Sequence, residues 1–169
     1  MRPPAIIQDL GPSYAQLARH VLIRSEVEGD RVVAAIEIVS RGNKIGRSKV
    51  DQFASKCMGY LESGIHLAVL DVQVPTTQVR VGFHALICDA MGQDPPEAPQ
   101  GHDRQVVSYQ VRSSGYPRAY VAQLKVGSPL PDLPLFVLPD KFLSLPLEAT
   151  YGAAYASLAR KFQEALVAP

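Results

Sequence analysis

A single carboxylate, that of Glu37, lies inside an otherwise apolar run, RVVAAIEIVS, at residues 31–40. Val, Ile and Ala in so continuous a run are typical of a strand buried on both faces of a sheet. An ionised side chain in such a strand destabilises the fold unless it is paired, hydrogen-bonded or bound to a metal. Either Glu37 is satisfied near the strand's end by a lysine or a backbone amide, or it belongs to a functional site.

Lys56 and Asp71 are the residues that could join Glu37 at the carboxyl edge of the sheet. Glu37 lies about 10 Å below that edge at ~3.3 Å per residue, and Lys56 lies about 12 to 14 Å down the following helix at ~1.5 Å per residue. A magnesium-dependent phosphodiesterase needs two carboxylates to hold the cation and an ammonium to orient water and offset phosphorane charge. The alternative is that Asp71 caps its strand and Lys56 is a solvated residue on the helix flank.

The elements that position these residues follow from hydrophobic periodicity. Residues 20–27 alternate as a strand does, the EGD turn follows, and residues 31–40 complete a hairpin. The polar loop SRGNKIG leads into residues 47–63, whose apolar side chains recur at helical spacing. Residues 65–74 then form a second buried strand, so a right-handed crossover makes the two buried strands parallel and the fold class α/β.

The second half of the chain predicts elements that complete this sheet. Residues 83–91 predict a short amphipathic helix, and residues 105–111 with 119–126 predict a second, C-terminal hairpin that extends the sheet or packs on it. The Pro- and Leu-rich residues 129–146 predict an extended strap across the surface, or alternatively a ligand for a Pro-recognising partner.

The two ends of the chain predict helical structure. Apolar residues from Tyr151 to Leu166 predict a final amphipathic helix that closes the core, with Glu148 at its positive N-terminal end. A Pro-rich entry precedes residues 12–19, which predict a short helical turn.

Composition sets further bounds. The chain has 169 residues, of which 47% are hydrophobic and 20% charged, so we expect one domain over residues 1–169, with the hairpin-helix-strand core at 20–74 and the C-terminal part at 102–166. The net charge of +1 provides no long-range attraction for nucleic acid, so binding of one depends on a local basic rim of Arg41, Lys44, Arg47 and Lys49. Cys57 and Cys88 are expected to be free thiols, and no apolar stretch has the length of a signal or membrane segment, so a soluble, cytoplasmic protein without a membrane partner is expected.

Two longer motifs carry a family resemblance. IEIVSRGNK at residues 36–44 is followed by SKCMGYLESGIHLAVLD at residues 55–71, and together they resemble a bacterial family of domains of unknown function in the PD-(D/E)XK nuclease-like superfamily. The likeness continues through AYVAQLKVGSPLPDLPLFVL and LSLPLEATYGAAYASL, so it covers nearly the whole chain from about His20. It implies a mixed sheet with a β-hairpin, a crossover helix and a parallel strand.

The resemblance also implies a site that binds Mg or Mn when the protein is catalytic. It assigns the catalytic carboxylate to Glu37 and the lysine to Lys56, and it matches Ser40, Asn43 and Lys44 to the family's strand-to-helix signature as cofactor-binding residues. Asp71 is the second candidate metal ligand beside Glu37.

The sequence departs from the family's pattern at the carboxylate of the first hairpin strand. A two-residue turn places His20 or Leu22 opposite Glu37, and neither is acidic. Glu26 is offset by roughly 13 to 20 Å at ~3.3 Å per residue, too far to share a metal ion. The ancestral metal site is therefore expected to be incomplete, and a second copy of the chain or the C-terminal hairpin is expected to cover the open sheet edge.

Two functional hypotheses follow. The first is a catalytically degenerate domain that acts as a binding or assembly module, with nucleic acid or a homodimer partner as the expected partners. The alternative is a metal-dependent (Mg or Mn) nuclease acting on nucleic-acid phosphodiesters, in which Asp71 or His20 replaces the missing ligand.

Overall fold

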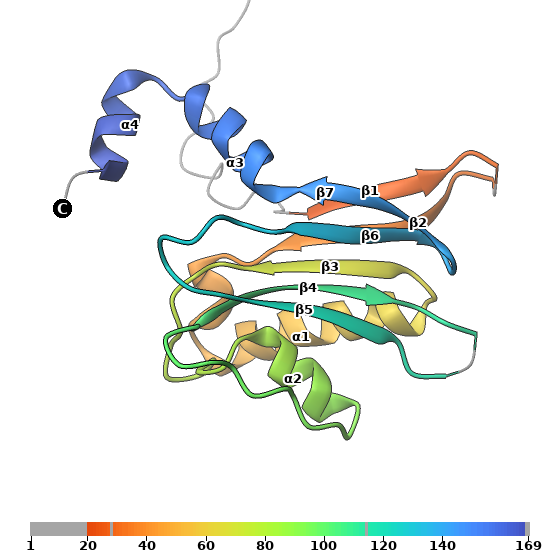
Figure 1. Cartoon of the computed structure of the whole chain (residues 1–169). Helices are drawn as coiled ribbons and strands as arrows, with labels where there is room; N and C mark the ends of the chain where they lie inside the picture. Colours follow the sequence, from red (N-terminus) through yellow and green to blue (C-terminus); the bar gives the residue numbers. More distant parts are fainter. Residues whose placement is uncertain (1–19, 28, 114, 168–169) are drawn as a thin grey trace, which may run out of the picture.

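The computed structural model describes residues 20–27, 29–113 and 115–167, and the predicted turn at residues 12–19 lies outside them (Figure 1). In chain order the elements are β1 (His20–Ser25), β2 (Arg31–Ile38), the 3₁₀ turn η2 (Arg41–Lys44), α1 (Arg47–Glu62), β3 (His66–Asp71), α2 (Phe83–Ala90), β4 (Arg104–Gln110), β5 (Arg118–Leu124), β6 (Asp132–Leu138), β7 (Lys141–Pro146), α3 (Leu147–Ala156) and α4 (Arg160–Val167).

Strands β1 to β5 form one mixed sheet whose order in space is β1-β2-β3-β4-β5. β2 and β3 are parallel and are joined through α1, while the other neighbouring pairs are antiparallel. The α/β class, the first hairpin, the crossover helix and the parallel pair are therefore confirmed. A register shift between Ile23 and Arg24 places His20 directly opposite Glu37.

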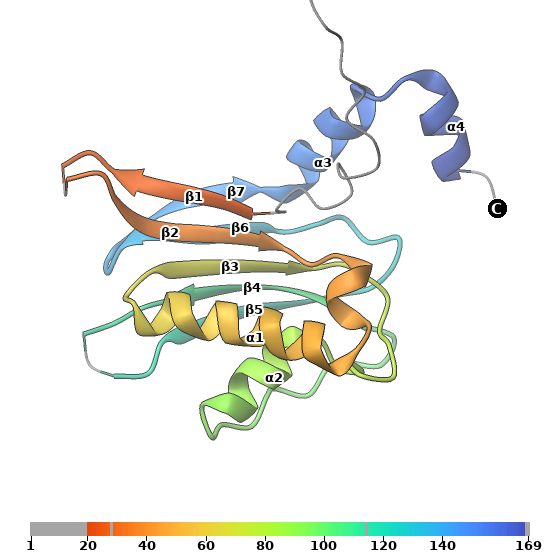
Figure 2. The same cartoon turned by 180° about the vertical axis from the view of Figure 1, so that it is seen from behind.

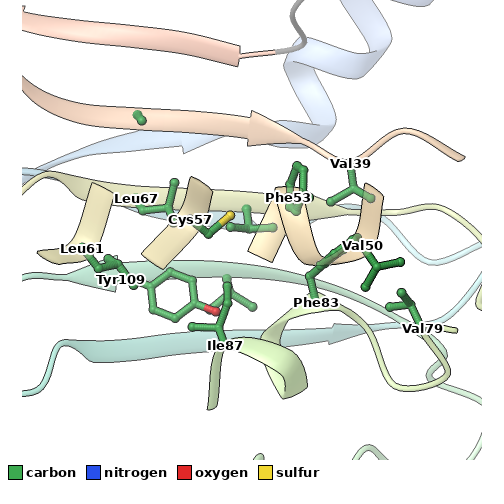
Figure 3. Packing of buried hydrophobic residues seen from close by; sticks show 13 residues of the cluster. Val39, Val50, Phe53, Cys57, Leu61, Leu67, Val79, Phe83, Ile87 and Tyr109 are labelled. Atoms are coloured by element: carbon green, nitrogen blue, oxygen red, sulfur yellow. The ribbon is translucent and has the colours of Figure 1, made fainter. Parts of the chain in front are cut away.

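Helices α1 and α2 cover one face of this sheet (Figure 2). The buried side chains of α1 are Val50, Phe53, Cys57 and Leu61, the positions that helical periodicity predicted. They pack against Phe83 and Ile87 of α2 and against side chains of the sheet, as Figure 3 shows. Phe53 and Phe83 lie with ring centroids 4.4 Å apart, so aromatic packing joins the two helices.

A third hairpin, β6–β7, covers the opposite face, so the molecule has three layers (Figures 1 and 2). The prediction of a surface strap at residues 129–146 was wrong, because the extended chain folds back on itself and buries Leu133 and Leu135 against Ala34, Ala68 and Val106 of the sheet. Proline is tolerated here because both strands of a two-stranded ribbon are edge strands.

The C-terminal segment forms two short helices that extend away from the layers in both views (Figures 1 and 2). The prediction of one helix that closes the core was wrong, since α3 has no buried residue and Tyr151, Leu158 and Phe162 are exposed. The β6–β7 hairpin covers the sheet face opposite to α1 and α2 instead. None of the described helices combines the length and apolar composition needed to cross a lipid bilayer.

The edge of the sheet beside β1 has no strand partner among the described residues. The hairpin β4–β5 joins the sheet next to β3 and not at β1, so the prediction that the C-terminal hairpin covers the β1 edge was wrong. Val21 and Leu22 of β1 are exposed.

Candidate functional site

Glu37 lies on the helix-covered face of β2, because it alternates with Ala35 and Val39, which both belong to the helix-side core. Its side chain is 2% exposed. The carboxylate is therefore a buried charge near the carboxyl end of a central strand, as the sequence predicted.

Lys56 of α1 neutralises this charge. Its Nζ lies 2.6 Å from Glu37 Oε2 and donates a hydrogen bond to it, and it also lies 5.2 Å from the centre of the Phe53 ring. The Lys56 side chain is 42% exposed, so solvent reaches the ion pair from the lysine side, on the flank of α1. The second carboxylate oxygen, Oε1, is buried and has no hydrogen-bond partner among the described residues.

The Glu37 carboxylate also changes the pKa of two neighbouring side chains. Burial, and then the nearby Glu37 carboxylate, raise the pKa of Tyr60 and of Cys57 to about 12 in each case. Both groups consequently keep their protons at neutral pH, which excludes Cys57 as a thiolate nucleophile and Tyr60 as a base.

Asp71 belongs to a second, separate ion pair at the end of β3. Lys44 Nζ lies 2.5 Å from Asp71 Oδ1 and donates to the carbonyl oxygen of Gln73 at 2.9 Å. Asp71 Oδ2 accepts a hydrogen bond from the backbone N–H of Phe83 at 3.0 Å. Burial raises the pKa of the Asp71 carboxyl, while the Lys44 ammonium and the Phe83 amide oppose that rise.

The strand-to-helix loop holds Lys44 in place. The Ser40 hydroxyl accepts from the Asn43 N–H, and the Asn43 side chain accepts from the Ser40 N–H, so the two residues cap η2 reciprocally. Thr76 Oγ1 donates to the Lys44 carbonyl at 2.8 Å. Ser40 and Asn43 thus use these polar groups in hydrogen bonds within the loop itself. Lys44 is buried, so it does not contribute to a basic rim with the exposed Arg41 and Arg47.

The structure brings Glu37 and Lys56 together, but it gives Asp71 a different lysine. Sequence reasoning missed Lys44 as the partner of Asp71. The signal available was a lone lysine in the loop after one buried strand and a lone aspartate at the end of its parallel neighbour, which end at the same sheet edge.

The Mg or Mn ion that the nuclease resemblance implies does not fit these residues. Magnesium requires near-octahedral oxygen coordination, whereas Asp71 already uses its two oxygens for Lys44 and Phe83. In the described part of the chain, no group of three or more His, Cys, Asp or Glu residues could hold a metal ion. Among the described residues, Glu37 Oε1 and Asp71 Oδ1 are both buried without a hydrogen-bond partner, but Asp71 Oδ1 lies at ion-pair distance from Lys44, whereas Glu37 Oε1 has no cation at that distance.

Comparisons with family models, with curated proteins and with solved structures find no match to this chain.

Proposed function

We propose that this protein is a catalytically degenerate domain of PD-(D/E)XK nuclease-like fold that acts in the cytoplasm as a binding or assembly module. The observation that supports this proposal is that each candidate carboxylate is already neutralised by its own lysine, Glu37 by Lys56 and Asp71 by Lys44. A cation brought to either carboxylate would meet an ammonium at ion-pair distance and would be repelled by it.

The position opposite Glu37 supports the same conclusion. His20 occupies the register position directly across the hairpin, where the resemblance leads one to expect an acid. A histidine side chain is never negatively charged, so it cannot offset the positive charge of a divalent ion. The site therefore has one available anionic oxygen, too few to hold Mg or Mn at cellular concentrations.

A cytoplasmic location is consistent with the cysteines. Cys57 is buried and Cys88 is half-buried, and neither forms a disulfide. Free buried thiols are typical of proteins in reducing compartments.

The alternative function is a metal-dependent nuclease acting on nucleic-acid phosphodiesters, and one observation favours it. Glu37 Oε1 is buried without a hydrogen-bond partner in the described part of the chain, which normally destabilises a fold. A ligand at this oxygen would remove the penalty, and Lys56, half-exposed beside it, would face a bound phosphate.

Single-turnover cleavage of plasmid, single-stranded DNA and RNA in the presence of manganese tests the proposal. We expect no cleavage by the wild type. Glu37→Ala and Lys56→Ala are the diagnostic variants, and Lys141→Ala is the matched control because Lys141 is an exposed lysine of β7, outside the basic rim. Cleavage that both diagnostic variants abolish and the control retains would overturn the proposal in favour of the nuclease.

The expected partners are tested separately. The edge of β1, which has no strand partner within residues 20–167 as described, and its exposed Val21 and Leu22 support assembly into a homodimer. Light scattering coupled to size-exclusion chromatography should give a dimer mass for the wild type and a monomer mass for Val21→Lys. Nucleic-acid binding is measured by fluorescence anisotropy at two salt concentrations, since binding through a local basic rim weakens as salt rises.

A further inference from the structure

A cleft of about 270 Å³ opens at the end of the sheet opposite to Glu37, where β2 and β3 begin. The turn of β6–β7, the loop after β4 and the start of β2 lie together at this end in both views (Figures 1 and 2). The residues that line the cleft are Arg31, Val33, Gly64, His66, Val111, Arg112, Ser113, Val137, Leu138 and Pro139.

His66, the first residue of β3, places a hydrogen-bond donor in this cleft. The residue is 4% exposed, and its Nδ1 accepts a hydrogen bond from the backbone N–H of Val111 at 3.0 Å. An imidazole nitrogen that accepts carries no proton, so the ring is neutral and its single proton is on Nε2. Burial also lowers the pKa of His66, which favours the same neutral form.

The Nε2–H group of His66 has no acceptor among the described residues. It is also absent from the fully buried polar atoms that lack a partner, so Nε2 retains contact with open space. His66 lines the cleft, and the cleft is therefore the space that this N–H reaches. His66 is more than nine-tenths buried, and the hydrogen bond at Nδ1 fixes the orientation of its ring. The Nε2–H group is therefore preorganised to donate to an oxygen acceptor.

Positive charge accompanies this donor. Arg112 and Arg31 both line the cleft, and no aspartate or glutamate is present among the residues that form it. Arg112 is exposed and makes no hydrogen bond or ion pair with another described residue. His66 and Arg112 thus offer donors to a ligand, with the Ser113 hydroxyl as an additional donor or acceptor.

The remaining walls of the cleft are apolar, which indicates that the ligand has an apolar part. Val33 and Val111 belong to the sheet side, and Val137 and Leu138 belong to the end of β6. A volume of about 270 Å³ accommodates a small organic molecule. The ligand should therefore combine one anionic group with a short aliphatic body.

We propose that this cleft binds a small organic anion, with a carboxylate or phosphate group on His66 Nε2 and Arg112 and an aliphatic chain against Val33, Val111 and Leu138. The inference does not depend on the proposed function, because the cleft lies where β2 and β3 begin and Glu37 lies near the carboxyl end of β2.

Isothermal titration of the full chain tests the proposal with four probes: 3-methylbutanoate, isobutyl phosphate, inorganic phosphate and the methyl ester of 3-methylbutanoate. We expect one of the two organic anions to bind with a dissociation constant below about 1 mM, and inorganic phosphate and the neutral ester to bind at least about tenfold more weakly. The preferred organic anion identifies the head group as carboxylate or phosphate.

Arg112→Gln should weaken binding of that anion by about tenfold or more, since it removes a charge-assisted hydrogen bond. Arg118→Gln, an exposed arginine of β5 that is not part of the cleft, is the matched control and should leave binding unchanged. A ¹⁵N nuclear magnetic resonance spectrum of the His66 ring should show a protonated Nε2 whose signal moves when the anion is added.

Three results would overturn the proposal. The first is absence of binding by both organic anions, and the second is equal affinity for the neutral ester. The third is an Arg112→Gln protein, folded by circular dichroism, that binds as tightly as the wild type.

Discussion

The two buried ion pairs of this protein use the same chemistry in different surroundings. Lys44 and Asp71 are each 1% exposed, and both oxygens of Asp71 have a partner. Glu37 is equally buried, but its partner Lys56 is 42% exposed and Glu37 Oε1 has no described partner. A pair with no access to solvent is a structural contact, whereas a pair whose lysine is open to solvent on one side has the features of a site.

Asp71→Asn should have the largest effect on stability of the substitutions in the two ion pairs, because it leaves the Lys44 ammonium buried without a counter-charge. We expect a loss of about 3 to 5 kcal/mol in the free energy of unfolding, because an unpaired buried charge is strongly destabilising. Urea denaturation measures it. Asp51→Asn is the control, since Asp51 pairs with Arg47 at an exposed position and should cost less than about 1 kcal/mol.

Gly82→Ala tests how tightly the surroundings of Asp71 are packed. A Cβ at Gly82 would lie 1.9 Å from Gln105 Nε2 and 3.3 Å from Asp71 Oδ2, and the residue has a φ of +85°. We expect a loss of about 2 to 3 kcal/mol from overpacking and backbone strain. Gly59→Ala should instead stabilise the helix by up to about 1 kcal/mol, because its Cβ meets no atom within 4 Å.

Lys56→Met addresses the open pair and should cost about 2 kcal/mol, since it leaves a buried acceptor without its hydrogen bond. The loss is smaller than for Asp71→Asn because water can replace the half-exposed ammonium. Chemical denaturation beside Lys49→Met, an exposed lysine of the same helix, provides the measurement. A loss as large as that of Asp71→Asn would make the two pairs equivalent and remove the distinction between them.

Acid should also lower the free energy of unfolding through two buried histidines that belong to neither ion pair. Burial lowers the pKa of His66 and of His84 below the ordinary value of 6.5. As pH falls below 6.5 the unfolded chain takes up these protons first, so stability is lost between 6.5 and the lowered values and is fully present above 6.5. Urea midpoints measured across this range should fall with acid in the wild type and in Glu37→Gln alike. A flat profile would contradict the neutral state assigned to the two histidines.

Glu37→Gln should have the smallest effect, with stability unchanged or slightly raised. A carboxylate kept for a function relieves a desolvation penalty when it is neutralised, and Lys56 can turn into solvent. Thermal and urea unfolding measure the difference. A loss of about 2 kcal/mol or more would show instead that Glu37 is a structural partner of Lys56.

Sequence reasoning was most successful where a regular element sets the distance between residues. The rise per residue of a strand and of a helix places Glu37 and Lys56 at similar depth, and the two side chains do meet. Hairpin pairing gave His20 as one of two candidates opposite Glu37, and the shift between Ile23 and Arg24 selects it.

The parts that could not be predicted depend on irregular backbone or on packing between distant segments. Lys44 lies in a loop whose direction no periodicity encodes, and its burial requires the chain after β3 to pass beside it. The prolines of residues 129–146 interrupt the strand pattern, so pairing of Leu133 with Leu145 could not be read from the sequence. The side chains of α3 were predicted to close the core because the sequence does not show that β6–β7 covers the second face of the sheet.

The order of strands in the main sheet has a consequence for synthesis of the protein. Because β1 to β5 lie side by side in the order in which they are translated, each strand can join the sheet as it leaves the ribosome. The apolar face of Ala34, Ala68 and Val106 is covered only when the hairpin ending at Pro146 has emerged. During that interval the nascent chain exposes a finished but uncovered sheet, and this is when it has the greatest need of a chaperone.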